Sequence, residues 1–153
     1  YQKLINDNRI FTDREISRKV NLQYTLNLVS TFLGGLYTRN DKVDEYLDLY
    51  IEDFPLKDKV CQHFNKTALL FNSLDLPHNS MWFNKANFFS LFYELSKYQD
   101  LDIDPAELSI LLNNFQPDDA YKIAAKEGVN NNKERTLRSI TISNLLKSLQ
   151  DVQ

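Results

Sequence analysis

The chain contains little glycine, proline and cysteine, and it lacks a long apolar run. Its 153 residues include three glycines, four prolines and one cysteine. Short strands joined by tight turns use glycine and proline freely, so their scarcity favours helices. Cys61 has no partner for an internal disulfide, and no signal peptide or apolar run long enough to cross a bilayer is present. We therefore expect an all-α protein in a reducing, cytoplasmic setting, with no membrane partner.

An excess of positive charge is also missing. Eighteen lysines and arginines stand against 21 aspartates and glutamates, for a formal net charge of -3. This balance argues against nucleic-acid binding through overall basicity but leaves room for a local basic patch. The chain begins at Tyr1, and its one methionine is Met81. We expect residues 1–153 to form a single helical domain that is a fragment of a longer polypeptide.

Capping signals and hydrophobic periodicity predict the first long helix. Thr12 and Glu15 have the spacing of a capping box, in which each side chain bonds the other residue's backbone amide. Apolar residues then recur at helical spacing until Gly34 and Gly35, which are a natural stop. The pattern predicts one continuous helix from Thr12 to the glycines.

Two further helices are predicted around Pro55. Apolar residues between Val43 and Phe54 have the i, i+3, i+4, i+7 spacing of a half-buried helix that Pro55 would end. Pro55 can also open the next helix. The face of that helix is predicted to contain Val60, Phe64, Ala68, Phe71 and Leu74.

The stretch from Ser80 to Tyr98, SMWFNKANFFSLFYELSKY, holds the only tryptophan, four phenylalanines and two tyrosines. It could stack nucleic-acid bases or form a protein core. At 100° per residue, one broad side carries Phe88, Phe89, Leu91, Phe92 and Leu95, and the other carries Asn87, Ser90, Glu94 and Lys97. This segregation predicts a core helix with Asn84 as its N-cap. Only Trp82, Lys85 and Tyr98 are then expected at the surface.

Three helices are predicted in the remaining sequence. One starts with Asp104 as N-cap and Pro105 at the first position, and another begins around Asp118 and ends at Gly128. The last begins near Lys133, and its apolar side is predicted to contain Leu137, Ile140, Leu145 and Leu149. In sum we expect a multi-helix orthogonal bundle of about six to eight helices.

Candidate metal and cofactor sites are weak. Asp100, Asp102 and Asp104 resemble the start of a calcium loop, but the glycine and the bidentate glutamate of such a loop are missing. Cys61 and His63 are two residues apart, so on a helix they point away from each other, and a buried apolar cysteine is expected instead. We predict no catalytic residue, no metal and no cofactor.

Seven basic residues are the candidate nucleic-acid-binding site. Arg9, Arg14, Arg18 and Lys19 cluster around the start of the first long helix. Lys133, Arg135 and Arg138 open the last one. Arginines and lysines gathered in this way can neutralise the phosphates of DNA, although a solvated face paired with nearby carboxylates is the alternative.

Three segments resemble the helical region that follows the ParB-like nuclease fold in the GmrSD-type family of modification-dependent restriction proteins. They are NRIFTDREISRKVNLQYTLNLVSTFLGGLYTRNDKVDEYLDLY from Asn8, WFNKANFFSLFYEL from Trp82 and YKIAAKEGVNNNKERTLRSITISNLL from Tyr121. The resemblance lies in the order and type of the helices and covers most of the chain. The family's Asp-Gly-Gln-Gln-Arg-type motif and its HNH-type nuclease motif are not present, so no catalytic residue carries over.

The resemblance implies an accessory, non-catalytic helical scaffold domain of a DNA-targeting defence protein, with the catalytic domain of the same polypeptide as its partner. Two alternatives stay open from the residues alone. One is a nucleic-acid-binding module that contacts DNA through the basic residues at the helix starts. The other is a protein-interaction helical domain of unrelated function.

Overall fold

The computed structural model describes residues 1–7, 9–98 and 103–150. Within these ranges the chain forms nine α-helices and one 3-10 turn, and no strand. In chain order they are α1 (Gln2–Ile5), α2 (Asp13–Ser17), α3 (Val20–Gly34), α4 (Val43–Leu49), α5 (Lys57–Ser73), η1 (Met81–Phe83), α6 (Lys85–Ser96), α7 (Pro105–Asn114), α8 (Asp119–Ala124) and α9 (Asn132–Gln150). The prediction of an all-α helical bundle is confirmed.

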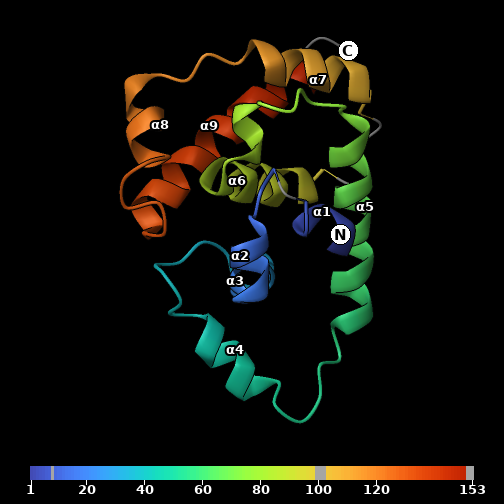
Figure 1. Ribbon diagram of the computed structural model, residues 1–153, viewed down its shortest axis with the longest axis vertical. Coiled ribbons are helices and arrows are strands. Elements are labelled where there is room, and N and C mark those ends of the chain that lie inside the picture. The colour runs from blue at the N-terminus through green and yellow to red at the C-terminus, as the bar shows by residue number, and fades with distance from the viewer. Residues whose placement is uncertain (8, 99–102, 151–153) are drawn as a thin grey trace.

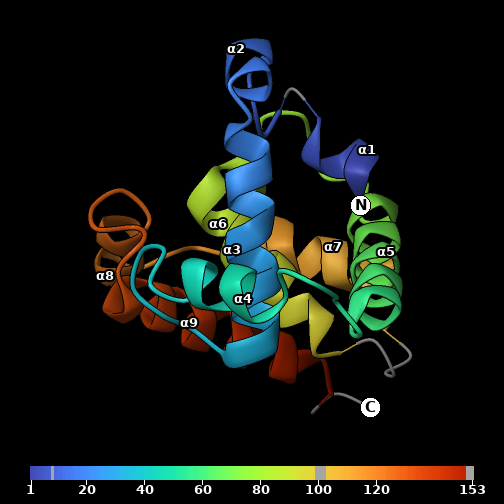
Figure 2. The ribbon, with the colours of Figure 1, turned by 90° about the horizontal axis from the view of Figure 1, so that it is seen from below.

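The long helices run crosswise around α6. Helix α5 stands vertically in Figure 1, whereas α3 points along the line of sight there and stands vertically in Figure 2. Helix α9 crosses behind α3, and α8 and α5 lie on opposite sides of α3 in Figure 2. Helix α6 packs against α3, α5 and α9. This arrangement makes α6 the centre of the core and leaves α3 with neighbours on both flanks.

The aromatic stretch is the core, as predicted. Phe88, Leu91, Phe92 and Leu95 of α6 are each at most 1% exposed. The ring of Phe88 lies 5.1 Å from that of Phe71 on α5, in an edge-on arrangement that favours aromatic pairs. These aromatics are therefore not available to stack nucleic-acid bases.

The other side of α6 is buried too, which the sequence did not predict. Asn87, Ser90 and Glu94 were expected to face solvent, but α8 and α9 cover them. Asn87 accepts a hydrogen bond from the Tyr121 hydroxyl, and Glu94 accepts one from the Ser139 hydroxyl. Asn87, Ser90 and Glu94 can be buried because each forms a hydrogen bond with a residue of another helix.

Trp82 was predicted at the surface, and this prediction is wrong. The indole is 1% exposed, and its Nε1–H donates to the Leu112 carbonyl of α7 at 3.0 Å. A buried indole N–H needs an acceptor, and this hydrogen bond supplies it.

The predicted helix starts are confirmed where a side chain caps them. Thr12 and Glu15 form the full capping box at α2. The side chains of Asn84, Asp104 and Asp118 accept from backbone amides at the starts of α6, α7 and α8. Asp104 is therefore a cap rather than a calcium ligand. Asp100 and Asp102 lie outside the described residues.

The first long helix is broken in two. Lys19 has a φ of 59°, in the left-handed region, and separates α2 from α3. Periodicity could not reveal this break, because the apolar residues of the two helices stay in phase across it. The stop at Gly34 and Gly35 is confirmed, since α3 ends at Gly34.

Helix α4 is shorter than predicted. It ends at Leu49, so the second half of the predicted apolar face is not helical. Ile51 in that half is 79% exposed, whereas Tyr50 and Phe54 are partly buried. Cys61 is also exposed instead of buried.

The predicted face of helix α9 is confirmed in part, because Leu137, Leu145 and Leu149 are partly buried against the core. Ile140 was expected to be buried and is 56% exposed, whereas Ile142 and Leu146 are fully buried. The buried side also contains Arg135 and Arg138, at 2% and 1% exposure. These two arginines occupy core positions, which hydrophobic periodicity cannot detect.

Candidate functional site

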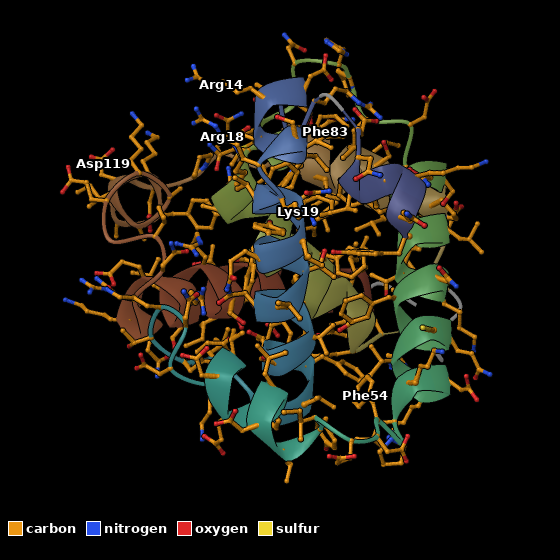
Figure 3. All side chains as sticks on the ribbon, turned by 60° about the horizontal axis from the view of Figure 1, so that its bottom comes forward. Arg14, Arg18, Lys19, Phe54, Phe83 and Asp119 are labelled. Atoms are coloured by element: carbon orange, nitrogen blue, oxygen red, sulfur yellow. The ribbon has the colours of Figure 1, made fainter. Side chains whose placement is uncertain are left out.

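The predicted basic residues fall into an exposed and a buried set. Arg14, Arg18, Lys19 and Lys133 are exposed. Figure 3 shows Arg14 and Arg18 on the outer side of α2, above Lys19 at its junction with α3. No ion pair involves these four side chains among the described residues.

Arg9 belongs to neither set, because its side chain is 28% exposed and has partners within the protein. Its guanidinium forms an ion pair with Asp7 at 2.6 Å and lies 4.0 Å from the centre of the Phe83 ring. The hydrogen bonds from Arg9 lower the pKa of the Asp7 carboxyl, because they stabilise its charged form. Arg9 therefore fixes the segment before α2 onto η1.

Arg138 is a buried hub that joins three segments. Its Nε donates to the Ser90 hydroxyl of α6 at 3.0 Å, and its terminal nitrogens donate to the carbonyls of Ala124 and Val129. These bonds attach α9 to α6, to the end of α8 and to the loop between α8 and α9. The Arg138 side chain does not reach the outer surface where DNA contacts were predicted.

Arg135 attaches α9 to the loop after α3. Its guanidinium donates to the Tyr37 carbonyl at 3.0 Å and to the Asn27 side-chain oxygen at 3.3 Å. It also lies 4.7 Å from the centre of the Phe89 ring. Like Arg138, it is buried and therefore contributes to the interior rather than to a helix surface.

Both guanidiniums line a pocket on one flank of α3. The pocket has a volume of about 330 Å³. Its walls come from α3, α6, α9 and the two loops, through Val20, Gln23, Tyr24, Asn27, Asn40, Lys85, Ala86, Phe89, Val129, Asn130, Arg135 and Arg138. We call this the arginine pocket.

Backbone bonds between the two loops hold the rim of the arginine pocket. The Arg39 amide donates to the Asn130 carbonyl at 2.6 Å, and the Asn132 amide donates to the Thr38 hydroxyl at 3.2 Å. Asn40 and Asn130, which line the pocket, are thereby fixed on adjoining segments that are about 90 residues apart in the sequence.

The electrostatics of the arginine pocket are unusual because neither buried arginine has a carboxylate partner. None of the ion pairs among the described residues includes Arg135 or Arg138. Burial lowers the pKa of both guanidiniums, with the loss of hydration as the largest cause. The charge of Glu134 acts on Arg138 in the opposite direction without an ion pair. The ordinary pKa of arginine is so high that both guanidiniums stay charged at neutral pH in spite of this lowering.

A second hollow lies on the opposite flank of α3. It has a volume of about 190 Å³ and is lined almost entirely by apolar and aromatic side chains of α3, α4 and the segment that follows. The lining residues are Leu26, Val29, Ser30, Leu33, Val43, Tyr46, Leu47, Tyr50 and Phe54. We call this the apolar groove, and Figure 3 marks Phe54 at its end.

The segment that forms one wall of the apolar groove is acidic. The segment from Asp41 to Asp53 carries six exposed acidic residues, Asp41, Asp44, Glu45, Asp48, Glu52 and Asp53. Its one basic residue, Lys42, is already paired with Glu45 at 2.6 Å. Leu47, Leu49 and Ile51 on the same segment are 49%, 65% and 79% exposed. Exposed apolar side chains on an acidic segment are typical of a docking surface for a basic partner.

Sequence reasoning found the arginines but not their positions, and it missed the groove. One signal was present for the pocket. Val20, Gln23, Tyr24 and Asn27 recur at i, i+3, i+4 and i+7 beside the apolar row of α3. When residues at helical spacing occupy a second face of a helix, that face is also expected to contact other parts of the protein.

The described residues contain no group of histidine, cysteine and carboxylate side chains that could hold a metal ion. In the same part of the chain, every helix is too short or too polar to cross a membrane.

No family model matches the chain, and neither do the curated proteins or the solved structures compared with it. The resemblance to the helical region of GmrSD-type proteins therefore stays an expectation.

Proposed function

We propose that the chain is an accessory helical scaffold domain of a cytoplasmic, DNA-targeting defence protein, without catalytic activity of its own. The observation that carries the docking role is the apolar groove between α3 and the acidic segment that contains α4. The defence role is supported by the resemblance of the three sequence segments. In this proposal the groove receives part of the catalytic domain of the same polypeptide.

Charge and shape together specify the occupant. The groove runs beside a short helix with exposed leucines, and an amphipathic helix can place apolar side chains into such a hollow. The six exposed carboxylates of the segment from Asp41 to Asp53 favour lysines and arginines on that helix. We therefore propose a basic amphipathic helix of the catalytic domain as the occupant.

The test is binding of the separately expressed neighbouring domain, measured by isothermal titration calorimetry. Leu47→Ser removes an apolar contact in the groove and should weaken binding at least tenfold. Leu69→Ser is the matched control, because Leu69 on α5 is also exposed and lies outside the groove. Equal affinities for both variants would contradict the proposal, as would self-association of the chain through the groove in sedimentation experiments.

The proposal also predicts that the purified chain neither cleaves DNA nor hydrolyses nucleotides. Metal-dependent cleavage that disappears when one of the chain's own residues is substituted would overturn the non-catalytic role.

A second candidate function, nucleic-acid binding, is favoured by the exposed arginines of α2. Arg14 and Arg18 project from one side of α2 with no ion pair in the described part of the chain, and Lys19 follows them. A salt titration of DNA binding should give a steep negative slope if they neutralise phosphates.

The double variant Arg14→Gln, Arg18→Gln should reduce that slope by about two, one for each lost phosphate contact. Lys57→Gln with Lys59→Gln on α5 is the control of equal charge change. The absence of DNA binding at low salt would remove this second candidate.

A further inference from the structure

We propose that the arginine pocket binds a nucleoside monophosphate, with its phosphoryl group at Arg135 and Arg138. This site is distinct from the apolar groove and from the exposed arginines of α2, so it does not depend on either proposed function. The inference starts from the uncompensated charge of the pocket.

The two guanidiniums retain hydrogen-bonding capacity toward a ligand. Each arginine has five N–H donors. The structure gives Arg135 two hydrogen bonds and Arg138 three, all to neutral oxygens. Arg135 also interacts with the Tyr37 side chain, so the five N–H groups of each guanidinium are only partly used, and both side chains line the pocket. A phosphoryl group, with several acceptor oxygens and negative charge, suits planar N–H donors of this kind.

Buried charge makes an anion more favourable here than at the surface. Arg135 and Arg138 are 2% and 1% exposed, so water screens their charges weakly. A third cation, Lys85, lies at the wall and is paired with Glu15 at 2.7 Å. An incoming anion would thus meet two buried positive charges that have no carboxylate partner among the described residues.

The remaining space selects for a group larger than phosphate. The pocket volume of about 330 Å³ is several times that of a phosphate ion and falls in the range of small-molecule sites. Tyr24, Phe89 and Val20 supply apolar surface in the walls. Gln23, Asn40 and Asn130 supply amides, which can donate to and accept from the edge of a base. A phosphate attached to a flat ring with polar edges matches this lining.

The first arm of the experiment identifies the ligand chemistry by titration calorimetry at low salt. The probes are inorganic phosphate, ribose 5-phosphate, the four deoxynucleosides and their 5′-monophosphates. At least one monophosphate should bind ten times more tightly than inorganic phosphate, and its deoxynucleoside should not bind detectably. Equal binding of phosphate and monophosphates, or no binding at millimolar concentrations, would overturn the proposal.

The second arm places the ligand in the pocket without altering the structural arginines. Gln23→Glu adds a carboxylate at the pocket wall and should weaken monophosphate binding at least tenfold. Gln62→Glu is the matched control, because Gln62 is an exposed helical glutamine on α5 that does not line the pocket. If the two variants bind equally, the pocket is not the site.

The third arm distinguishes a free nucleotide from a nucleic-acid end. Single-stranded oligonucleotides are compared with and without a terminal phosphate. Tighter binding of the phosphorylated oligonucleotide than of the monophosphates assigns the pocket to a strand end, and the reverse order assigns it to a free nucleotide. In either case Gln23→Glu should weaken binding. If the terminal phosphate adds nothing and the monophosphates do not bind, the proposal fails.

Discussion

At the scale of single residues, Arg138 has the greatest consequence for the structure. Its three hydrogen bonds reach two helices and a loop. Removing the guanidinium would leave the buried Ala124 carbonyl and the partly buried Val129 carbonyl without this donor, and buried unpaired carbonyls are costly. Arg138 is therefore both a pocket residue and a structural one.

We predict that Arg138→Met lowers the free energy of unfolding by about 3 kcal/mol, since a hydrogen bond to a charged group contributes about 1.5–3 kcal/mol. Arg138→Lys should not restore stability, because one ammonium cannot reproduce the planar fork. Urea denaturation measures both. Arg14→Met on the exposed side of α2 should change stability by no more than about 0.5 kcal/mol. Similar losses in all three variants would contradict the role of Arg138.

Lys19 also has a large effect on the structure, in this case through its backbone conformation. Its φ of 59° lies in a region that L residues adopt at a cost of roughly 1–2 kcal/mol and that glycine adopts freely. Lys19→Val, which adds a branched Cβ, should be less stable than Lys19→Gly by at least about 1 kcal/mol in thermal or urea unfolding. If the two variants are equally stable, α2 and α3 are not separated by a left-handed residue.

The residue types could be recognised from the sequence, but their environments could not. Arginine is almost always exposed, so a basic surface was the reasonable prediction for Arg135 and Arg138. Arg135 bonds to the Tyr37 carbonyl and to Asn27, about 100 residues away in the chain, and Arg138 bonds to Ser90, 48 residues away. Long-range partners of this kind leave no local pattern.

At the scale of helices, α9 shows how a face can be misread. Ile140 and Ile142 are two positions apart, and only Ile142 points into the core. The predicted leucines are partly buried against the core, and the most deeply buried positions are Arg135, Arg138, Ile142 and Leu146. The start of the helix is correctly predicted, and its buried face is only partly so.

We predict that Ile142→Ala costs about 2–5 kcal/mol, because it opens a cavity in a fully buried site. Ile140→Ala makes the same chemical change on the same helix and should cost no more than about 0.5 kcal/mol. Circular dichroism during urea unfolding compares them. A larger loss for Ile140→Ala would show that the sequence-based face was right.

Helix starts were predicted better than helix interruptions. Caps are local, so Thr12, Asn84 and Asp104 identify their helices from a few neighbouring residues. The break at Lys19 and the early end of α4 have no such signal. They are set by packing on other helices, which overrides local preference.

At the scale of the whole molecule, a cation–π contact and an ion pair connect the start of the chain to the centre. Arg9 pairs with Asp7 and packs on Phe83, and Lys85 at the start of α6 pairs with Glu15 of α2. The hydrogen bond from Lys85 lowers the pKa of Glu15, as that from Arg9 does for Asp7. A carboxyl whose pKa is lower in the folded state stabilises the fold above its unfolded pKa.

Stability should therefore fall as the pH drops below about 4, the ordinary pKa of an aspartate or glutamate, and through the lower folded values. Asp7→Asn should reduce this acid sensitivity, measured as the slope of unfolding free energy against pH. Asp119→Asn is the control, because the Asp119 side chain is 95% exposed. An unchanged slope in Asp7→Asn would contradict the contribution of the Asp7 pair.

Both hollows are properties of the whole molecule and could not be predicted as such. The arginine pocket needs two loops that meet through the Arg39 and Asn130 backbone, and the apolar groove needs α4 to turn back onto α3. The sequence supplies the side chains, whereas the crosswise arrangement of the helices brings them together (Figures 1 and 2).

The most direct test of this account is an NMR measurement of the arginine Nε–H groups. Arg138 Nε–H is buried and bonded to Ser90, whereas Arg14 and Arg18 are exposed. The account predicts that the Arg138 Nε–H exchanges with water far more slowly than those of Arg14 and Arg18 at neutral pH. Equally rapid exchange at all three positions would show that Arg138 lies at the surface, and the arginine pocket would not exist as described.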